Sequence, residues 1–165
     1  MTVAERAKKI KLLLTDCDGV LTDAGVYYGA DGEVLKRFSI RDGMGVERLH
    51  KLGEVETGII TGEMSPSVAK RAEKLKITEL HLGVKNKMER LAQILSRKGL
   101  TLEEIAYIGD DVNDLEVLNT IGLATCPSDA MQPILEMAHY TCINRGGHGC
   151  FREVAELIIQ SKLKP

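Results

Sequence analysis

Two short apolar runs, each followed at once by acidic residues, constrain the fold of this chain more than any other feature. The acidic residues are Asp16 and Asp18, after Leu12–Thr15, and Asp110, Asp111 and Asp114, after Ile105–Ile108. Continuous apolar runs of this length are typical of strands buried on both faces of a parallel sheet. Ligands of open α/β sheets bind beyond the carboxyl ends of such strands. We therefore expect both acidic clusters at one edge of one sheet.

Carboxylates that converge in this way repel one another unless a hard cation lies between them. Mg²⁺ fits such a site because it needs only a few carboxylates and keeps water molecules for other oxygen ligands. The sequence therefore predicts a magnesium site to which Asp110 contributes a ligand. Asp111 and Asp114 are expected to hold water molecules or a lysine around it.

Strand-like and helix-like segments alternate along the chain, which predicts an α/β fold with a Rossmann-like, doubly wound parallel sheet. The predicted strands are residues 12–15, 57–61, 79–82, 105–108 and 123–125, and the predicted helices are residues 43–52, 66–75, 86–98, 112–119, 130–138 and 151–163. Asp42 is expected to cap the first helix. Two strands around Gly29–Gly32 predict a short β-hairpin flap over about residues 25–38. The whole chain, residues 1–165, is expected to form one domain, with a tail from about residue 144 to the end.

The composition narrows the possible partners and the compartment. A formal net charge of −2 with 28% charged residues argues against a nucleic-acid-binding surface. No apolar stretch approaches the roughly 20 residues of a membrane span. The segment Met1–Arg6 lacks an apolar signal core, so a cytoplasmic location is expected. The four cysteines form no CxxC pair and are read as reduced thiols, with Cys17 pointing into the core.

Four groups at or just beyond predicted strand ends together predict a phosphoryl-transfer site. Asp16 would attack phosphorus as the nucleophile, and Asp18 would act as general acid and then as general base. Thr61 and Gly62 would bind phosphoryl oxygens, and Lys87 would supply positive charge. Each residue alone has an ordinary explanation, such as a turn, a strand end or a solvated lysine. Their combination in this order favours a catalytic site.

These motifs resemble those of the haloacid dehalogenase superfamily in its phosphatase branch. The chain resembles, nearly end to end, the 3-deoxy-D-manno-octulosonate 8-phosphate (KDO 8-phosphate) phosphatase family. The segments that carry the closer resemblance are Asp16–Asp23, Phe38–Gly43 and Arg145–Gly149, with Arg152 and Glu153. The resemblance implies a Mg²⁺-dependent phosphomonoesterase that releases KDO and phosphate. It also implies a metal held by the Asp16 carboxylate, the Asp18 backbone carbonyl and Asp110.

The spacing leaves no room for a cap domain, either between Asp18 and Thr61 or between Lys87 and Asp110. An open site would leave the substrate in water and weaken its electrostatic interactions, so another subunit is expected to serve as the lid. The resemblance implies a homotetramer in which the hairpins cluster and the glycine-rich tail reaches toward a site. The alternatives are an exposed flap and a mobile loop. The apolar hairpin residues Val26, Tyr28, Val34 and Phe38 argue against the former.

The same resemblance implies which residues contact a sugar-acid phosphate. They are Asp18, Ser39, Arg41, Asp42, Gly43, Glu63, Arg71, Lys74 and Arg145. Glu63 and Glu47 replace arginines usual in octulosonate phosphatases, and Glu63 with Lys74 looks more like phosphatases of nonulosonate (KDN or N-acylneuraminate) 9-phosphates. The segment Arg41–Gly43 has the octulosonate form. An exposed pair on a helix face is the plain explanation of Glu63 and Lys74. The eight-carbon substrate is ranked first and the nine-carbon substrate second.

Two functions of other classes remain. A phospho-accepting receiver also combines acidic residues, a hydroxyl and a lysine around a parallel sheet, but here the second strand ends in Thr61 rather than in an aspartate. A non-catalytic tetramerisation module would be expected to lack the nucleophile or the lysine, and this chain has Asp16 and Lys87. A working phosphatase is therefore the preferred hypothesis.

Overall fold

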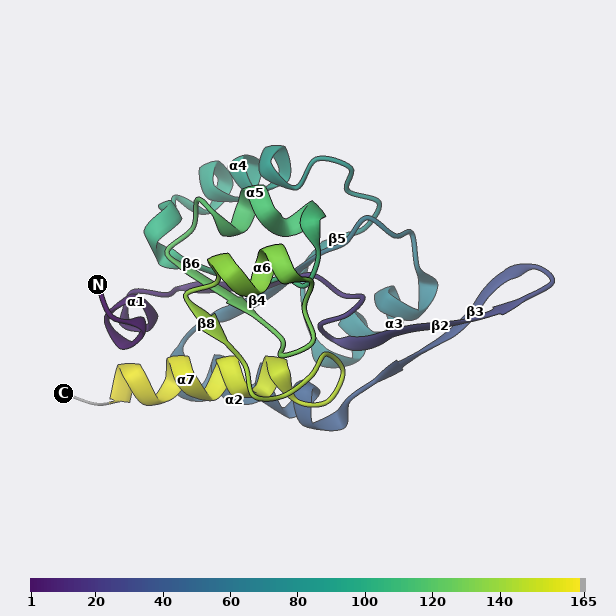
Figure 1. Ribbon diagram of the computed structural model, residues 1–165, viewed down its shortest axis with the longest axis horizontal. Helices are drawn as coiled ribbons and strands as arrows, with labels where there is room; N and C mark the ends of the chain where they lie inside the picture. Colours follow the sequence, from purple (N-terminus) through teal and green to yellow (C-terminus); the bar gives the residue numbers. More distant parts are fainter. Residues whose placement is uncertain (164–165) are drawn as a thin grey trace.

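The structure, a computed structural model, describes residues 1–163 of the chain (Figure 1). Its helices are α1 (Val3–Lys8), α2 (Ile40–Gly53), α3 (Pro66–Leu75), α4 (Lys87–Lys98), α5 (Leu115–Leu118), α6 (Gln132–Met137) and α7 (Cys150–Leu163), with 3₁₀ turns η1 (Leu102–Glu104) and η2 (Val112–Asp114). Its strands are β1 (Leu12–Thr15), β2 (Thr22–Gly29), β3 (Gly32–Phe38), β4 (Glu56–Ile60), β5 (Glu79–His81), β6 (Ile105–Ile108), β7 (Leu123–Cys126) and β8 (Tyr140–Thr141).

Six parallel strands form the central sheet in the order β5-β4-β1-β6-β7-β8. Helices cover both faces, so the doubly wound α/β prediction is confirmed. The helices α1, α2, α3 and α7 pack on one face, and α4, α5 and α6 pack on the other (Figure 1). Leu13 of β1 joins the first core, whereas Leu12 and Leu14 join the second. This alternation explains the apolar run, because a strand buried on both faces needs apolar side chains at every position.

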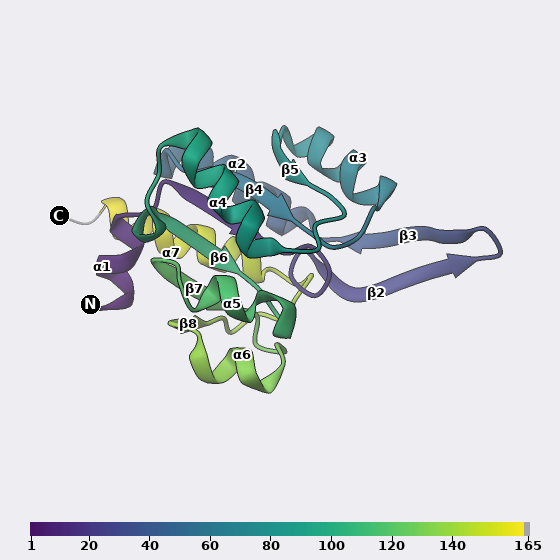
Figure 2. The same ribbon diagram turned by 90° about the horizontal axis from the view of Figure 1, so that it is seen from above.

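The strands β2 and β3 form a separate two-stranded hairpin that projects from the sheet edge, at the end opposite the two termini (Figure 2). The hairpin begins at Thr22, earlier than expected. Much of its apolar surface is open, with Tyr27, Tyr28 and Val34 each more than 60% exposed. Within residues 1–163, no part of the chain forms a separate cap domain over the sheet.

Several boundaries differ from the sequence predictions. Ser39, not Asp42, caps α2, because its hydroxyl accepts the Asp42 N–H and serine is among the favoured N-cap residues. The helix predicted over residues 112–119 is broken into η2 and the short α5. The elements α1 and β8 were not predicted, since both are too short to produce a periodic apolar pattern. The capping box of Thr2 and Glu5 marks the start of α1.

The glycine-rich segment before α7 packs on the loop that follows β1. The Gly147 N–H donates to the Val20 carbonyl at 2.8 Å. A Cβ atom on Gly146 would lie 1.9 Å from the Gly19 carbonyl oxygen, so only glycine allows this close approach. The last two residues of the predicted tail lie outside the described residues. Among residues 1–163, the structure contains no helix with the length and apolar character that a membrane crossing requires.

Candidate active site

The carboxyl ends of β1 and β6 bring the two acidic clusters together, as the sequence predicts. In the sheet register Thr15 lies opposite Ile108, and the Asp16 N–H donates to the Ile108 carbonyl at 2.9 Å. Asp16, Asp110 and Asp114 each offer a ligand atom, and these atoms lie within 4.8 Å of one another. Asp16 and the pair Asp110 and Asp114, which are far apart in sequence, therefore form one potential cation site.

Lys87 supplies the positive charge of this cluster from the first turn of α4. Its Nζ lies 3.2 Å from Asp16 Oδ2 and 2.6 Å from Asp114 Oδ1. Lys87 also donates to the Tyr107 hydroxyl, which in turn donates to Asp114 Oδ1 at 2.7 Å. Asp114 is fully buried. Its contact with Lys87 shows that it holds the lysine, which is one of the two roles expected for it. The cluster is a closed network of charge-assisted hydrogen bonds.

The remaining charge in the cluster is not balanced by Lys87 alone. Burial raises the pKa of Asp16 to about 7, and the neighbouring Asp114 carboxylate adds to that rise. Burial likewise raises the pKa of Asp110 to about 7, with further contributions from Asp16 and Asp114. Burial alone would lower the pKa of Lys87, but the carboxylates of Asp16 and Asp114 raise it. A divalent cation fits this oxygen-rich site, because it would neutralise the excess negative charge.

Mg²⁺ should therefore raise the melting temperature more at about pH 8 than at about pH 5, because it binds only ionised carboxylates. The folded-state pKa values of Asp16 and Asp110, both about 7, lie above the ordinary value of 3.8. Their contribution to the stability of the metal-free protein is thus present at low pH and lost as the pH rises through about 7. Calorimetry with and without Mg²⁺ measures the shift. Asp110→Asn should abolish the rise in melting temperature at both pH values. An equal rise at about pH 5 and about pH 8 in the unaltered protein would contradict the assignment of Asp16 and Asp110 as metal ligands.

Glycines allow the acidic side chains to approach the backbone of the neighbouring loops. A Cβ atom on Gly19, whose φ is +85°, would lie 1.9 Å from Asp110 Oδ2. A Cβ atom on Gly109 would lie 2.6 Å from the Asp114 carboxyl group. A side chain at either position would displace a carboxylate from the cluster.

Gly19→Ala should weaken Mg²⁺ binding at least about tenfold, by turning the Asp110 carboxylate away from the site. Gly99→Ala is the matched control, because Gly99 also has a positive φ, of +64°, but a Cβ atom there would contact nothing within 4 Å. Both variants should lose about 1–2 kcal/mol of stability from the left-handed backbone. Titration calorimetry with Mg²⁺ should separate them, and equal affinities would disprove the role given to Gly19.

Asp18 and Thr61 lie beside the cluster rather than in it. The Asp18 carboxylate is 31% exposed and accepts from Lys36 Nζ through both oxygens at 2.7 Å. Thr61 is buried at the end of β4, and its hydroxyl accepts the Glu63 N–H at 3.3 Å. Gly62 is exposed, and a Cβ atom there would make ordinary van der Waals contact with the Val84 carbonyl oxygen at 3.6 Å. The metal contact expected of the Asp18 carbonyl stays a prediction.

Asp111, by contrast, does not join the acidic cluster. Its side chain is exposed and accepts the Val112 N–H at the start of η2. Asp42, another predicted site residue, is buried, and its carboxylate accepts the N–H groups of Gly149 and Arg152 at the start of α7. Both carboxylates thus have structural partners within the chain, and their substrate and metal roles stay predictions.

Ser39, Gly43 and Arg71 form one contact where α2 and α3 meet the hairpin. The Arg71 guanidinium donates to the Ser39 carbonyl at 2.8 Å and lies 5.6 Å from the centre of the Phe38 ring. A Cβ atom on Gly43 would lie 2.6 Å from that guanidinium. Arg41, on the neighbouring turn, is exposed. The arginines are therefore near the base of the hairpin, and their contact with substrate stays a prediction.

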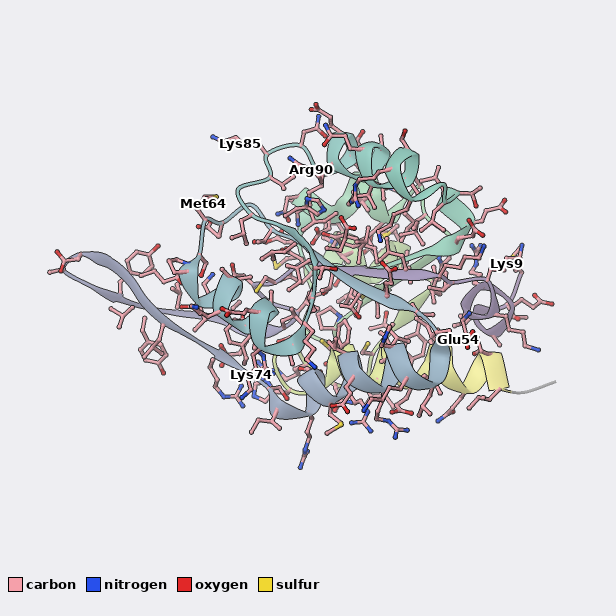
Figure 3. All side chains as sticks on the ribbon, turned by 180° about the vertical axis from the view of Figure 1, so that it is seen from behind. Lys9, Glu54, Met64, Lys74, Lys85 and Arg90 are labelled. Atoms are coloured by element: carbon pink, nitrogen blue, oxygen red, sulfur yellow. The ribbon has the colours of Figure 1, made fainter. Side chains whose placement is uncertain are left out.

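The other predicted substrate residues are spread over the surface. Glu63 is exposed next to Thr61, and Arg145 is exposed and bonded to Asp129 at 3.2 Å. Lys74 lies in the last turn of α3, at the end remote from Thr61, and lines a groove of about 570 Å³ between α2 and α3. Figure 3 likewise shows Lys74 beside α2, apart from Met64. Lys74 therefore does not reach the acidic cluster within this chain.

Sequence reasoning missed two residues that contact the predicted site. Tyr107 lies in the middle of the apolar run of β6, where its fully buried hydroxyl joins Lys87 to Asp114. A tyrosine in a strand buried on both faces needs a partner for its hydroxyl, which is the signal that could have found it. Lys36 lies in the hairpin, and no local pattern points to its contact with Asp18.

The sequence of this chain is similar to a known family and to several named phosphatases. Residues 58–153 match the family model of haloacid dehalogenase-like hydrolases. The chain is 39% identical to the 3-deoxy-D-manno-octulosonate 8-phosphate phosphatase of Yersinia pestis, over 98% of this chain and 87% of that protein. It is 37% identical to the Escherichia coli K12 phosphatase of the same name, over 98% and 86%.

Solved structures of such phosphatases are similar over almost the whole chain. The Yersinia pestis structure has a TM-score of 0.93 and 38% identity, covering 97% of this chain and 86% of that one. The Moraxella catarrhalis phosphatase, in complex with magnesium ion, phosphate ion and KDO, has a TM-score of 0.92 and 34% identity, covering 97% and 91%. Fold and sequence thus point to the same group of proteins.

Proposed function

The chain belongs to the haloacid dehalogenase-like hydrolases, and within them to the KDO 8-phosphate phosphatase family of phosphatases, and on that premise we propose that it hydrolyses KDO 8-phosphate to KDO and phosphate. The observation that carries the proposal is the buried contact of Lys87 with Asp16 at 3.2 Å, beside Asp110. This arrangement offers a carboxylate nucleophile, a cation for phosphoryl oxygens and ligands for Mg²⁺. A sugar-acid phosphate is the small-molecule partner.

The proposed reaction has two steps on Asp16. In the first, an Asp16 carboxylate oxygen attacks phosphorus, the bond from phosphorus to the sugar oxygen breaks, and Asp18 gives that oxygen a proton. In the second, Asp18 takes a proton from water as the water attacks the aspartyl-phosphate, which releases phosphate and restores Asp16. Lys87 and the groups at Thr61 and Gly62 stabilise charge on the phosphoryl oxygens.

Asp16, Asp110 and the Asp18 backbone carbonyl are the proposed ligands of Mg²⁺. When bound, the ion lowers the repulsion between the Asp16 carboxylate and the anionic phosphate. The Moraxella catarrhalis relative, which was solved with magnesium, supports this choice of metal. Asp114 is proposed to hold Lys87, and Asp111 is kept as a candidate for a water-mediated contact with the ion.

A nonulosonate 9-phosphate is the second candidate substrate. Glu63 favours it, because a carboxylate suits sugar hydroxyls and disfavours a substrate carboxylate nearby. Lys74 lies at the far end of α3, away from the acidic cluster of the same chain. It therefore supports the nine-carbon substrate only if Lys74 of another subunit contacts that substrate. The octulosonate is preferred because the relatives named above act on it.

A homotetramer whose neighbouring subunits complete the active sites is also proposed. The hairpin exposes Tyr27, Tyr28 and Val34, and a two-stranded ribbon cannot bury these side chains by itself. Light scattering should therefore give the mass of four chains, and replacing Tyr28 and Val34 with serine should lower it. A wild-type monomer with full activity would contradict the proposal. The cytoplasmic location stays a prediction.

Phosphate release from KDO 8-phosphate and from a nonulosonate 9-phosphate, with Mg²⁺ and side by side, tests the substrate. A clearly higher kcat/KM for the first is expected, and a higher value for the second would replace it. Glu63→Arg should move the preference toward the eight-carbon acid, whereas Glu73→Arg, on an exposed site that pairs with Lys70, should leave it unchanged. Release from neither substrate by a folded, metal-loaded protein would favour the assembly-module hypothesis.

A further inference from the structure

Lys36 is a buried lysine of β3, in the hairpin outside the central sheet, and it contacts Asp18, the predicted general acid. Its side chain is 2% exposed, and its Nζ lies 2.7 Å from both carboxylate oxygens of Asp18. Glu33 Oε2 lies 3.5 Å from the same nitrogen. Burial disfavours the charged form of Lys36, yet the hydrogen bond and charge of Asp18 raise its pKa above the ordinary value. A cation desolvated to this extent is held by its partners rather than by solvent.

A β-bulge in the hairpin produces this contact. Tyr27 lies opposite Leu35, but Tyr28 lies opposite Glu33, so the pairing register shifts around Val34. In a regular strand, residues three apart point to opposite faces. The extra residue places Glu33 and Lys36 on one face, consistent with the distance between their charged atoms.

The hairpin is fixed to the body of the protein at a second point. Ser65, the N-cap of α3, donates to Glu33 Oε1 at 2.5 Å and is itself buried. Glu33 therefore connects Lys36 to the element that follows Thr61. Glu33, beside the turn of the hairpin, and Lys36, nearer its base, are thus both held to the body of the protein, although Tyr27, Tyr28 and Val34 are exposed.

We propose that Lys36 is a positioning residue that holds the Asp18 carboxylate toward the leaving oxygen and away from the metal ligands. This inference rests on the proposed function. A free carboxylate two residues after Asp16 could turn toward a cation at Asp16 and Asp110 and be lost as a general acid. Lys36 engages one lone pair of each Asp18 oxygen, and the second lone pair of each remains for a proton. The hairpin thereby determines which aspartate binds metal and which transfers protons.

The leaving group of the substrate separates this role from others. A sugar oxygen needs a proton as it leaves, whereas p-nitrophenolate leaves without one. In kcat/KM, which reports the first step, Lys36→Met should lower the value for KDO 8-phosphate by roughly 10- to 100-fold, the range for residues that orient a catalytic group. It should lower the value for p-nitrophenyl phosphate by less than about 3-fold. Lys36→Arg should restore much of the loss, and Lys70→Met, in an exposed ion pair with Glu73, should cause none.

The double variant Asp18→Ala/Lys36→Met tests whether Lys36 acts through Asp18. The second change should add little to the first with the sugar phosphate, because the group that Lys36 positions is already absent. Multiplying losses, or equal losses with both substrates, would overturn the inference and would assign Lys36 to the phosphate or to the hairpin fold. Melting temperature and mass report the fold and the assembly. Failure of the unaltered protein to hydrolyse KDO 8-phosphate would instead overturn the proposed function.

Discussion

Asp16→Asn is expected to abolish phosphate release, by on the order of 10⁴-fold or more, the scale seen when a covalent nucleophile is removed. The amide has nearly the shape of the carboxylate but cannot attack phosphorus. The fold should survive, because burial and Asp114 already disfavour the charged form of Asp16, whose pKa is about 7. Lys87 keeps its contact with Asp114 at 2.6 Å. Steady-state assays with KDO 8-phosphate and Mg²⁺ measure the effect.

The matched control for this variant is Glu103→Gln, because Glu103 is exposed in η1, which precedes β6 and so lies at the opposite end of that strand from Asp110. It should retain most of the activity. The melting temperature and mass of Asp16→Asn should match those of the unaltered protein. Substantial turnover by a folded Asp16→Asn protein would reject Asp16 as the nucleophile and would favour direct attack by water.

Asp18→Ala is expected to lower kcat for the sugar phosphate by roughly 10²–10⁴-fold, because it removes general acid and general base assistance together. It leaves Lys36 with Glu33 as its remaining charged partner, at 3.5 Å. The loss should be smaller in kcat/KM for p-nitrophenyl phosphate, whose leaving group needs no proton. Parallel kinetics with the two substrates measure this difference.

Asp23→Ala is the comparison for that experiment, since Asp23 lies at the start of β2, five residues after Asp18, and pairs with Arg37 at 3.8 Å rather than with Lys36. It should behave nearly as the unaltered protein. If Asp18→Ala affected both substrates equally in kcat/KM, then Asp18 would serve the phosphoryl group or the metal rather than the leaving oxygen.

The sheet and the acidic cluster could be predicted because both follow from local patterns. Apolar runs identify the parallel strands, and the carboxyl ends of parallel strands must share an edge. Asp16 and Asp110 meet at this edge because β1 and β6 are also neighbours in the sheet, which the local patterns alone do not specify. Lys87 was predicted to compensate their charge and lies within hydrogen-bond reach of Asp16.

The hairpin contacts could not be predicted, because they depend on a register shift and on long-range packing. Strand alternation would place Glu33 and Lys36 on opposite faces, and only the bulge near Val34 brings them together. The contacts of Asp42 were missed for a similar reason. The local capping rule assigned Asp42 to the start of α2, whereas its carboxylate accepts N–H groups at the start of α7, which is far away in sequence.

Lys74 shows the limit of reading one chain. It fits a substrate contact by motif, yet it lies in the last turn of α3, in a groove against α2. A contact with substrate then requires a second subunit, whose arrangement no pattern within the chain specifies. Residues at the strand ends of the same chain, such as Asp16 and Asp110, are therefore easier to predict than a contact that needs another subunit.

The most direct test of the covalent mechanism is to find the phosphoryl group on the protein. Asp18→Ala should accept phosphate from p-nitrophenyl phosphate but hydrolyse the intermediate slowly, because no base activates water. Acid quenching within one turnover, followed by mass spectrometry of peptides, should show one phosphoryl group on the peptide that contains Asp16, and none in Asp16→Asn/Asp18→Ala. A phosphoryl group on another residue, or none during a burst of p-nitrophenol release, would contradict the account.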